Sequence, residues 1–151
     1  LPGGYDYIKY YGRGPHENYQ DRNTSAPVGV YTQTVKEQYY AYPRPQENGN
    51  KTDIRWFEII NKQGVGLSIS SDILLSMSAL NYFDVDLDDG DEKDQRHSGE
   101  LKPREETQLH IDYKQMGIST GPLVLQQYRL PYQNYKYRFK VTALKPSITL
   151  R

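Results

Sequence analysis

Apolar and polar side chains alternate along much of this 151-residue chain. A period of two places one face of a β-strand against a core and the other face in water. The alternation predicts strands over four segments: 5–11, 64–70, 107–113 and 135–143. The last of them is the longest, and its odd-numbered positions from Tyr135 to Ala143 are apolar. We therefore predict that these side chains form the buried face of a long antiparallel strand.

The segment 53–60 differs because it is apolar on both sides. Its two faces carry Ile54, Trp56 and Ile60, and Phe57 and Ile59, respectively. A strand that is covered on both faces lies inside a layered sandwich. We therefore expect Trp56, the only tryptophan, to be buried.

No segment shows the 3.6-residue apolar stripe of a helix, and glycines and prolines separate the predicted strands. We interpret the acidic stretch 84–96 as a surface loop or a single helical turn. The ends, 1–4 and 145–151, are interpreted as strand end or tail. This pattern predicts an all-β fold, an antiparallel β-sandwich with one short helical turn, as a single domain over 1–151.

Composition favours a folded chain without a polyanionic partner. The mean hydropathy is low, at −0.88, but 15 Tyr, 3 Phe and 1 Trp are more aromatic surface than a solvated coil carries. Lys plus Arg and Asp plus Glu number 19 each, which argues against nucleic acid or an anionic membrane as partner. The first residue is not Met, and strand-like alternation begins almost at once, so we expect an excised piece of a longer protein.

The residues that carry metal and nucleophile chemistry are sparse. Zero cysteines exclude a disulfide scaffold, a thiolate zinc site and a Cys nucleophile. Asp84, Asp86 and Asp88 have EF-hand-like spacing, but the sixth position is Asp89 and the twelfth is Gln95. This favours a solvated acidic loop, with a weak surface cation as the alternative. The three histidines are scattered, so no metal site and no cofactor are predicted in this domain.

Two polar clusters stand out, at 12–22 and at 43–56. In the first, glycines flank Arg13 and a proline follows, which fits a tight turn closed by charge-assisted hydrogen bonds from Glu17, Asp21 and Arg22. The second is another rigid turn that leads into the strand at 53–60. For both clusters a polar network that pins loops is the favoured interpretation, and a wall of a carbohydrate cleft is the alternative.

The same clusters resemble signatures of one enzyme family. The sequence Gly-x-Gly-Pro-x-Glu-x-Tyr-x-Asp-Arg at 12–22 resembles the C-terminal "small chain" domain of glycoside hydrolase family 2 β-galactosidases. The elements at 45–49 and 55–56, the segment 109–118 and the segment 121–130 resemble further signatures in the same order. The motif residues on which the resemblance depends are Gly12, Gly14, Pro15, Tyr19, Asp21, Arg22, Glu47, Gly49, Arg55, Trp56, Asp112 and Gly117.

The resemblance implies a β-supersandwich of the galactose mutarotase-like kind, placed as an accessory domain beside a catalytic barrel. It implies that the two catalytic glutamates of the parent enzyme lie in that barrel, so no residue here is assigned a catalytic role. Ser119, Thr120, Arg13 and Glu17 are the residues expected near the parent's sugar site. Any Mg²⁺ or Na⁺ of the parent is expected elsewhere. Its β-galactoside and the remaining domains of the chain are the expected partners, without nucleic acid or membrane.

This sequence departs from well-known members in the loop at 119–123, which has no aromatic residue where they have a Trp near the galactose. The departure argues against a lactase-like preference and favours a different β-galactoside or a pocket completed by another domain. Two other classes stay open: a stand-alone carbohydrate-binding module, suggested by the 13% aromatic content, and a purely architectural or oligomerisation domain. A parent of this kind is expected to be bacterial, in the cytoplasm or the periplasm.

Overall fold

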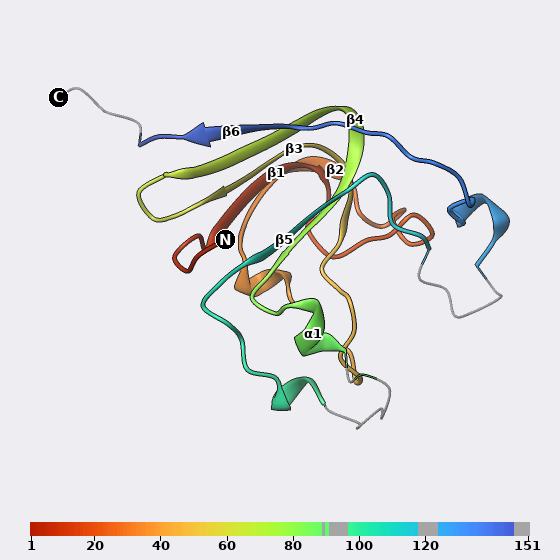
Figure 1. The fold of residues 1–151 in the computed structure, drawn as a ribbon, viewed down its shortest axis with the longest axis horizontal. Helices are drawn as coiled ribbons and strands as arrows, with labels where there is room; N and C mark the ends of the chain where they lie inside the picture. The colour runs from red at the N-terminus through yellow and green to blue at the C-terminus, as the bar shows by residue number, and fades with distance from the viewer. Residues whose placement is uncertain (89, 91–96, 118–123, 147–151) are drawn as a thin grey trace.

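The computed structural model describes residues 1–88, 90, 97–117 and 124–146, and nearly all of its regular structure is antiparallel sheet (Figure 1). The strands are β1 (Tyr7–Arg13), β2 (Val28–Thr34), β3 (Lys51–Ile60), β4 (Gly66–Leu80), β5 (Gln108–Asp112) and β6 (Lys140–Leu144). They form one sheet in the order β2-β1-β3-β4-β5, and β6 also pairs with β4. The short helix α1 (Asp84–Leu87) and the 3₁₀ turns η1 (Lys36–Gln38), η2 (Ser98–Glu100) and η4 (Gln126–Tyr128) complete the described structure. The prediction of an all-β antiparallel fold with one short helical turn is confirmed.

Strand β4 bends strongly, as Figure 1 shows, and it pairs with three other strands, β3, β5 and β6. Its first part, 66–70, pairs with β3 and with β6, whereas its last part, 76–80, pairs with β5. Between these parts the register against β3 shifts, because Ile54 lies opposite Leu75 while Trp56 lies opposite Ser70. Such a bulge bends the strand and re-aims the side chains on either side of it.

The core lies on one face of this bent sheet. Tyr31, Tyr10, Phe57, Ile69 and Val141 lie opposite one another across five strands, so they share that face. Ten buried side chains form the core: Ile8, Tyr10, Val35, Ile54, Phe57, Ile59, Ile69, Leu75, Met77 and Ala79. The bend in β4 brings Leu109 and Ile111 of β5 against this cluster.

The prediction that Trp56 is buried is wrong. Trp56 is partly exposed on the face opposite Phe57, beside Tyr11, with the two ring centroids 6.5 Å apart. The bulge explains this outcome, because it turns Ile54 to the same face as Phe57 and leaves Trp56 on the outer face. Sequence alternation alone places Ile54 and Trp56 together, which the structure does not.

The prediction for the last strand is wrong in its span and in its burial. Strand β6 begins only at Lys140 and ends at Leu144. The apolar positions before and within it are exposed: Tyr135 by 40%, Tyr137 by 38%, Phe139 by 41% and Val141 by 50%. They lie at the margin of the sheet, where Tyr113 packs beside Tyr135 and Tyr137, and the Tyr137 hydroxyl donates to the Ile111 carbonyl at 2.9 Å.

Strand β2 and the second half of β4 were not predicted. In β2 the exposed Val28 and Val30 flank a glycine, which gives a weak strand pattern. In β4 the residues from Leu75 to Leu80 are all buried, so polar Ser76 and Ser78 point to a covered face. Among the described residues, no helix has the length and apolarity needed to cross a membrane.

Candidate functional site

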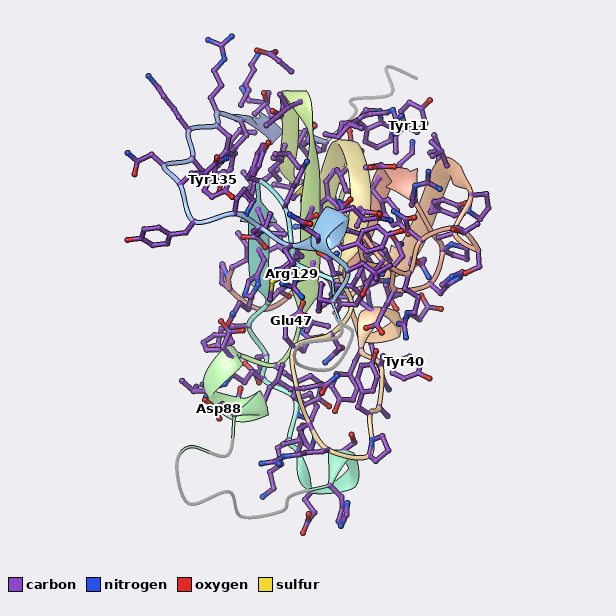
Figure 2. All side chains as sticks on the ribbon, turned by 90° about the vertical axis from the view of Figure 1, so that its right-hand side faces the viewer. Tyr11, Tyr40, Glu47, Asp88, Arg129 and Tyr135 are labelled. Carbon is purple, nitrogen blue, oxygen red and sulfur yellow. The ribbon has the colours of Figure 1, made fainter. Side chains whose placement is uncertain are left out.

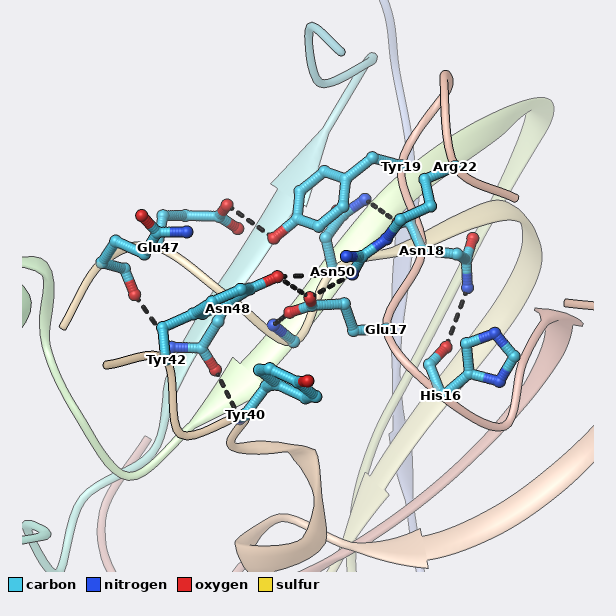
Figure 3. A network of polar contacts seen from close by, with 12 residues as sticks. His16, Glu17, Asn18, Tyr19, Arg22, Tyr40, Tyr42, Glu47, Asn48 and Asn50 are labelled. Carbon is cyan, nitrogen blue, oxygen red and sulfur yellow. Dashed lines mark hydrogen bonds and ion pairs between the residues drawn. The ribbon is translucent and has the colours of Figure 1, made fainter. Parts of the chain in front are cut away.

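The buried carboxylate of Glu17 joins the two polar clusters of the sequence (Figure 3). Strand β1 ends and the antiparallel β3 begins at the same edge of the sheet, so the loop at 14–27 meets the loop at 39–50 there. Glu17 is only 5% exposed. Its Oε1 accepts hydrogen bonds from Arg22 Nη2 at 2.5 Å and from the Tyr42 hydroxyl, and its Oε2 accepts one from the Gly49 amide at 2.7 Å. The three donors come from both loops, so one carboxylate fastens the loops together.

Two glycines of the motifs are required by this close packing. Gly49 has a φ of +76°, a region that favours glycine, and an added Cβ would lie 2.8 Å from the Gln38 carbonyl oxygen. Gly14 packs so closely that a Cβ would lie 2.3 Å from the Tyr10 hydroxyl oxygen. Both positions therefore let backbone approach a neighbouring loop or ring.

Asn18 fixes the loop after β1 to the start of β3. Its Oδ1 accepts hydrogen bonds from the Thr52 amide at 3.0 Å and from Thr52 Oγ1 at 2.6 Å. The backbone amide of Asn18 donates to the backbone carbonyl of Asn50 at 2.8 Å. In return, Asn50 Nδ2 donates to the backbone carbonyl of Asn18 at 2.8 Å. All three residues are buried, so these bonds form in a poorly solvated place where an unmade bond would cost about 1–3 kcal/mol.

Lys51 is a buried cation beside this network. It is 2% exposed, and its Nζ donates to the Gly49 carbonyl at 3.0 Å. Burial lowers the pKa of Lys51 to about 8, and the negative charge of Glu17 opposes this shift. The ammonium group is thus held in a place that disfavours its charge.

Glu47 extends the network toward β5. Its Oε2 accepts a hydrogen bond from the Tyr19 hydroxyl at 2.8 Å, as Figure 3 shows. Its Oε1 is buried without a hydrogen-bond partner in the described part of the chain. Burial raises the pKa of Glu47, and it also raises the pKa of the fully enclosed Tyr19 far above its usual value.

Arg13, predicted near the sugar site, is bound inside the structure. Its Nε lies 2.6 Å from Asp53 Oδ2, and its Nη1 donates to the Ala26 carbonyl at 3.0 Å. Asp53 has a φ of +56°, which is uncommon outside glycine, and the ion pair with Arg13 holds it there. Arg55 Nη1 donates to the Asp53 carbonyl at 2.7 Å on the same turn.

The structure brings the first and third motifs together. An added Cβ on Gly117 would lie 2.6 Å from Asp21 Oδ2, so the glycine lets the two segments touch. Asp112, just before this segment, accepts a hydrogen bond from Gln115 Nε2 at 3.0 Å. Ser119 and Thr120 lie outside the described residues.

The remaining motif residues have varied surroundings. Gly12 packs on Ile54, since a Cβ would lie 2.5 Å from its Cδ1, whereas Pro15 is exposed at the turn. Lys51 and Tyr42 belong to the network but were not predicted. A Lys at the start of a strand and one Tyr among fifteen carry no sequence signal of burial or pairing.

The chemistry of this arrangement is mainly internal. Glu17 has its acceptor atoms directed at donors of the same chain and almost no access to solvent. Within the described ranges, no three His, Asp or Glu side chains are arranged to hold a metal ion. The geometry is that of a polar network holding loops to a sheet, and the sugar-binding role of Arg13, Glu17, Ser119 and Thr120 stays a prediction.

Fold and network together define an all-β structural module in which buried polar motifs fasten loops to the end of a bent sheet. Comparison with known proteins gives its family. The chain belongs to the family described as "Beta galactosidase small chain", which it matches over residues 1–141. The resemblance predicted from the motifs is confirmed.

Full-length relatives carry the name β-galactosidase. The chain is 42% identical to the one from Priestia megaterium over 118 residues, which is 78% of this chain and 11% of that relative. It is 31% identical to the one from Staphylococcus xylosus over 93% of this chain and 14% of that relative. It is 33% identical to the β-galactosidase of Vibrio cholerae over 97% of this chain and 14% of that relative. All three relatives are bacterial, and the chain spans only about an eighth of their length.

Proposed function

We propose that this chain is a non-catalytic accessory part of a bacterial β-galactosidase, which packs on the rest of the enzyme and helps to shape its sugar-binding cleft. The observation that carries the proposal is the family match over 1–141 combined with coverage of only 11–14% of relatives named β-galactosidase. Retaining glycosidases need two carboxylates about 5 Å apart, facing a sugar. Glu17, the most enclosed motif carboxylate, is instead committed to loop contacts.

An exposed apolar surface supports packing on further polypeptide. The partly exposed residues Tyr135, Tyr137, Phe139 and Val141 are here called the margin stripe, and Val141 lies opposite Ile69 of the core. In Figure 2, Tyr135 lies toward the β5 end of the sheet and Tyr11 toward the β1 end. Each aromatic residue of the stripe is about 40% exposed, and covering it would contribute on the order of 1–2 kcal/mol.

The open edge of β6 supports the same conclusion. Among the described residues β6 pairs with β4 alone, so its other edge carries unpaired amide and carbonyl groups. An unpaired edge beside an apolar stripe is a template for another strand. We expect a β-strand layer of the remaining enzyme to cover the stripe and this edge.

The polar network supports the cleft-shaping part of the proposal. Gly117 contacts Asp21, and Ser119 follows two residues later. Because Asp21 belongs to the loop that Glu17 and Asn18 fasten to β3, the segment leading to Ser119 starts from a rigid base. A rigid base is what positions a loop against a substrate.

A chimera tests the proposal. The segment of the Priestia megaterium enzyme that matches this chain is deleted, or replaced by this chain, and hydrolysis of an aryl β-galactoside is measured. We expect the deletion to be inactive, the chimera to recover activity, and the 151-residue chain alone to show no turnover. Turnover by the chain alone, or a folded chimera no more active than the deletion, would contradict the proposal.

Variants of the chimera test the surface. Tyr135→Ser with Tyr137→Ser should lower the activity and the melting temperature of the chimera. Val30→Ser is the matched control, because Val30 is 56% exposed on the opposite face of the sheet. Equal effects of the stripe variant and the control would argue against the margin stripe as the packing surface.

A further inference from the structure

One pocket of the described structure lies away from the Glu17 network. A cavity of about 680 Å³ opens between the segment before β1, the turn η1, the end of β4 and residues 103–105. Its walls include two aromatic rings and several polar groups: Asp6, Lys36, Tyr39, Asn81, Tyr82 and Glu105. We propose that this cavity binds one neutral hexopyranose unit.

Two tyrosines form an aromatic wall. The ring centroids of Tyr39 and Tyr82 are 4.4 Å apart, with their planes tilted by 39°. Tyr39 is held in place, because its hydroxyl donates to Ser98 Oγ at 3.1 Å and Ser98 Oγ donates to the Tyr42 carbonyl at 2.6 Å. Both rings are only partly buried, so they offer apolar surface on which the C–H face of a sugar ring can stack.

Polar groups around the rings are available to hydroxyl groups. Within the described residues, the side chains of Asp6, Lys36 and Glu105 make no hydrogen bond or ion pair. Carboxylates accept hydrogen bonds from sugar hydroxyls, and an ammonium group donates them. Arg104, also in the wall, is engaged with Asp86 by two bonds of 2.6 and 2.7 Å.

The charge and size of the cavity favour a neutral ligand. The wall carries Lys36 together with Asp6 and Glu105, and the charge of Arg104 is paired with Asp86, so charges of both signs are present and no cluster of one sign attracts an ion. The volume falls within the usual range for small-ligand sites, about 300–1,000 Å³. A second cavity, of about 530 Å³ beside Glu47, has several charged groups and no Phe, Tyr or Trp in its wall, so it lacks the large apolar ring on which a hexose stacks.

The cavity is formed before any ligand arrives. The Thr107 amide donates to the Leu1 carbonyl at 3.0 Å, and the Arg104 amide donates to the Asn81 carbonyl at 2.7 Å. Asn81 Nδ2 donates to the Glu106 carbonyl at 3.2 Å. Because these bonds join the N-terminal segment, the end of β4 and the segment before β5, binding needs little ordering of the walls.

A titration of the full 151-residue chain tests the inference. Galactose, glucose and lactose are titrated by calorimetry and by NMR, with the Gly3, Gly4 and Asn81 amide signals as reporters of the cavity. We expect millimolar binding of at least one of these sugars with shifts at those signals. The result does not depend on the proposed β-galactosidase role, so failure of the chimera would leave it intact.

Variants locate the site. Tyr82→Ala should weaken binding by at least about tenfold, whereas Tyr82→Phe keeps the ring and should bind within about threefold of the wild type. Tyr137→Ala, an exposed tyrosine of the margin stripe, should bind as the wild type does. If Tyr82→Ala does not fold, Asp6→Asn replaces it, with a several-fold loss expected.

Three results would overturn the inference. They are the absence of binding by the wild type to all three sugars, equal binding by a folded Tyr82→Ala, and shifts that map to the margin stripe. The last would move the sugar site to the exposed tyrosines of that stripe.

Discussion

Because Lys51 is buried, the free energy of unfolding of this chain should rise as the pH becomes alkaline. A free lysine has a pKa of 10.5, and burial lowers the pKa of Lys51 to about 8. Below about pH 8 the folded state holds the buried cation and bears the full cost of its desolvation. Between about pH 8 and pH 10.5 the unfolded chain binds more protons than the folded chain, so the free energy of unfolding rises with pH. The shift of about 2.5 pH units corresponds to about 3 kcal/mol, of which about 2 kcal/mol should appear by pH 9.5.

The measurement has to stop near pH 9.5 because tyrosines act in the opposite direction above it. Burial raises the pKa of Tyr10 and Tyr19, and it raises the pKa of Tyr42 to about 12. Above pH 10 the unfolded tyrosines lose protons that the folded ones keep, and stability then falls. Urea unfolding followed by the fluorescence of Trp56, the only tryptophan, gives the free energy of unfolding at each pH.

Lys51→Met is the decisive variant. It keeps the apolar stem and removes the titrating group, so its stability should not rise between about pH 8 and pH 9.5. At neutral pH it should be more stable by about 1–2 kcal/mol, since relief of the buried charge outweighs one lost hydrogen bond to Gly49. Lys9→Met, at an exposed lysine, should keep the wild-type slope. A wild type without the rise, or a Lys51→Met variant with the same rise, would refute this reasoning.

Three further predictions concern the network and the margin stripe, each measured by thermal or urea unfolding. Glu17→Gln should cost about 3 kcal/mol because it removes the charge facing an Arg and two other donors, whereas Glu58→Gln on the outer face of β3 should change stability by less than about 0.5 kcal/mol. Gly49→Ala should cost about 2 kcal/mol or more, since it combines a positive φ with a backbone clash, while Gly64→Ala has the positive φ but open space and should cost about 1 kcal/mol. Tyr137→Ser should lower the unfolding free energy of the chain by no more than about 2 kcal/mol, because it removes one hydrogen bond to the Ile111 carbonyl and the contact of a 38% exposed side chain with Tyr113, yet it should lower the activity of the chimera. A loss in Glu58→Gln as large as in Glu17→Gln, equal losses at both glycines, or a stable chimera indifferent to Tyr137 would contradict these predictions in turn.

The sequence predicted many of the residues that form the candidate site, but it did not predict which of them contact one another. The glycines at 12–14 and 49 and the charged residues around them indicated tight turns closed by polar contacts. Which donors meet Glu17 depended on contacts across more than twenty residues of chain, from Tyr42 and from the Gly49 amide. Local pattern carries no information on such distant pairs, and neither Lys51 nor Tyr42 was predicted for that reason.

The sequence by itself determined that the chain is an antiparallel, all-β fold, because a period of two fixes which side of a strand each side chain takes. It could not determine what covers each side. The bulge between Ile54 and Trp56 moved Ile54 to the face of Phe57, and the position of β6 at the sheet margin left Tyr135 and its neighbours exposed. Alternation is a local property of the backbone, whereas burial depends on which distant segment packs above, and only the tertiary structure decides that.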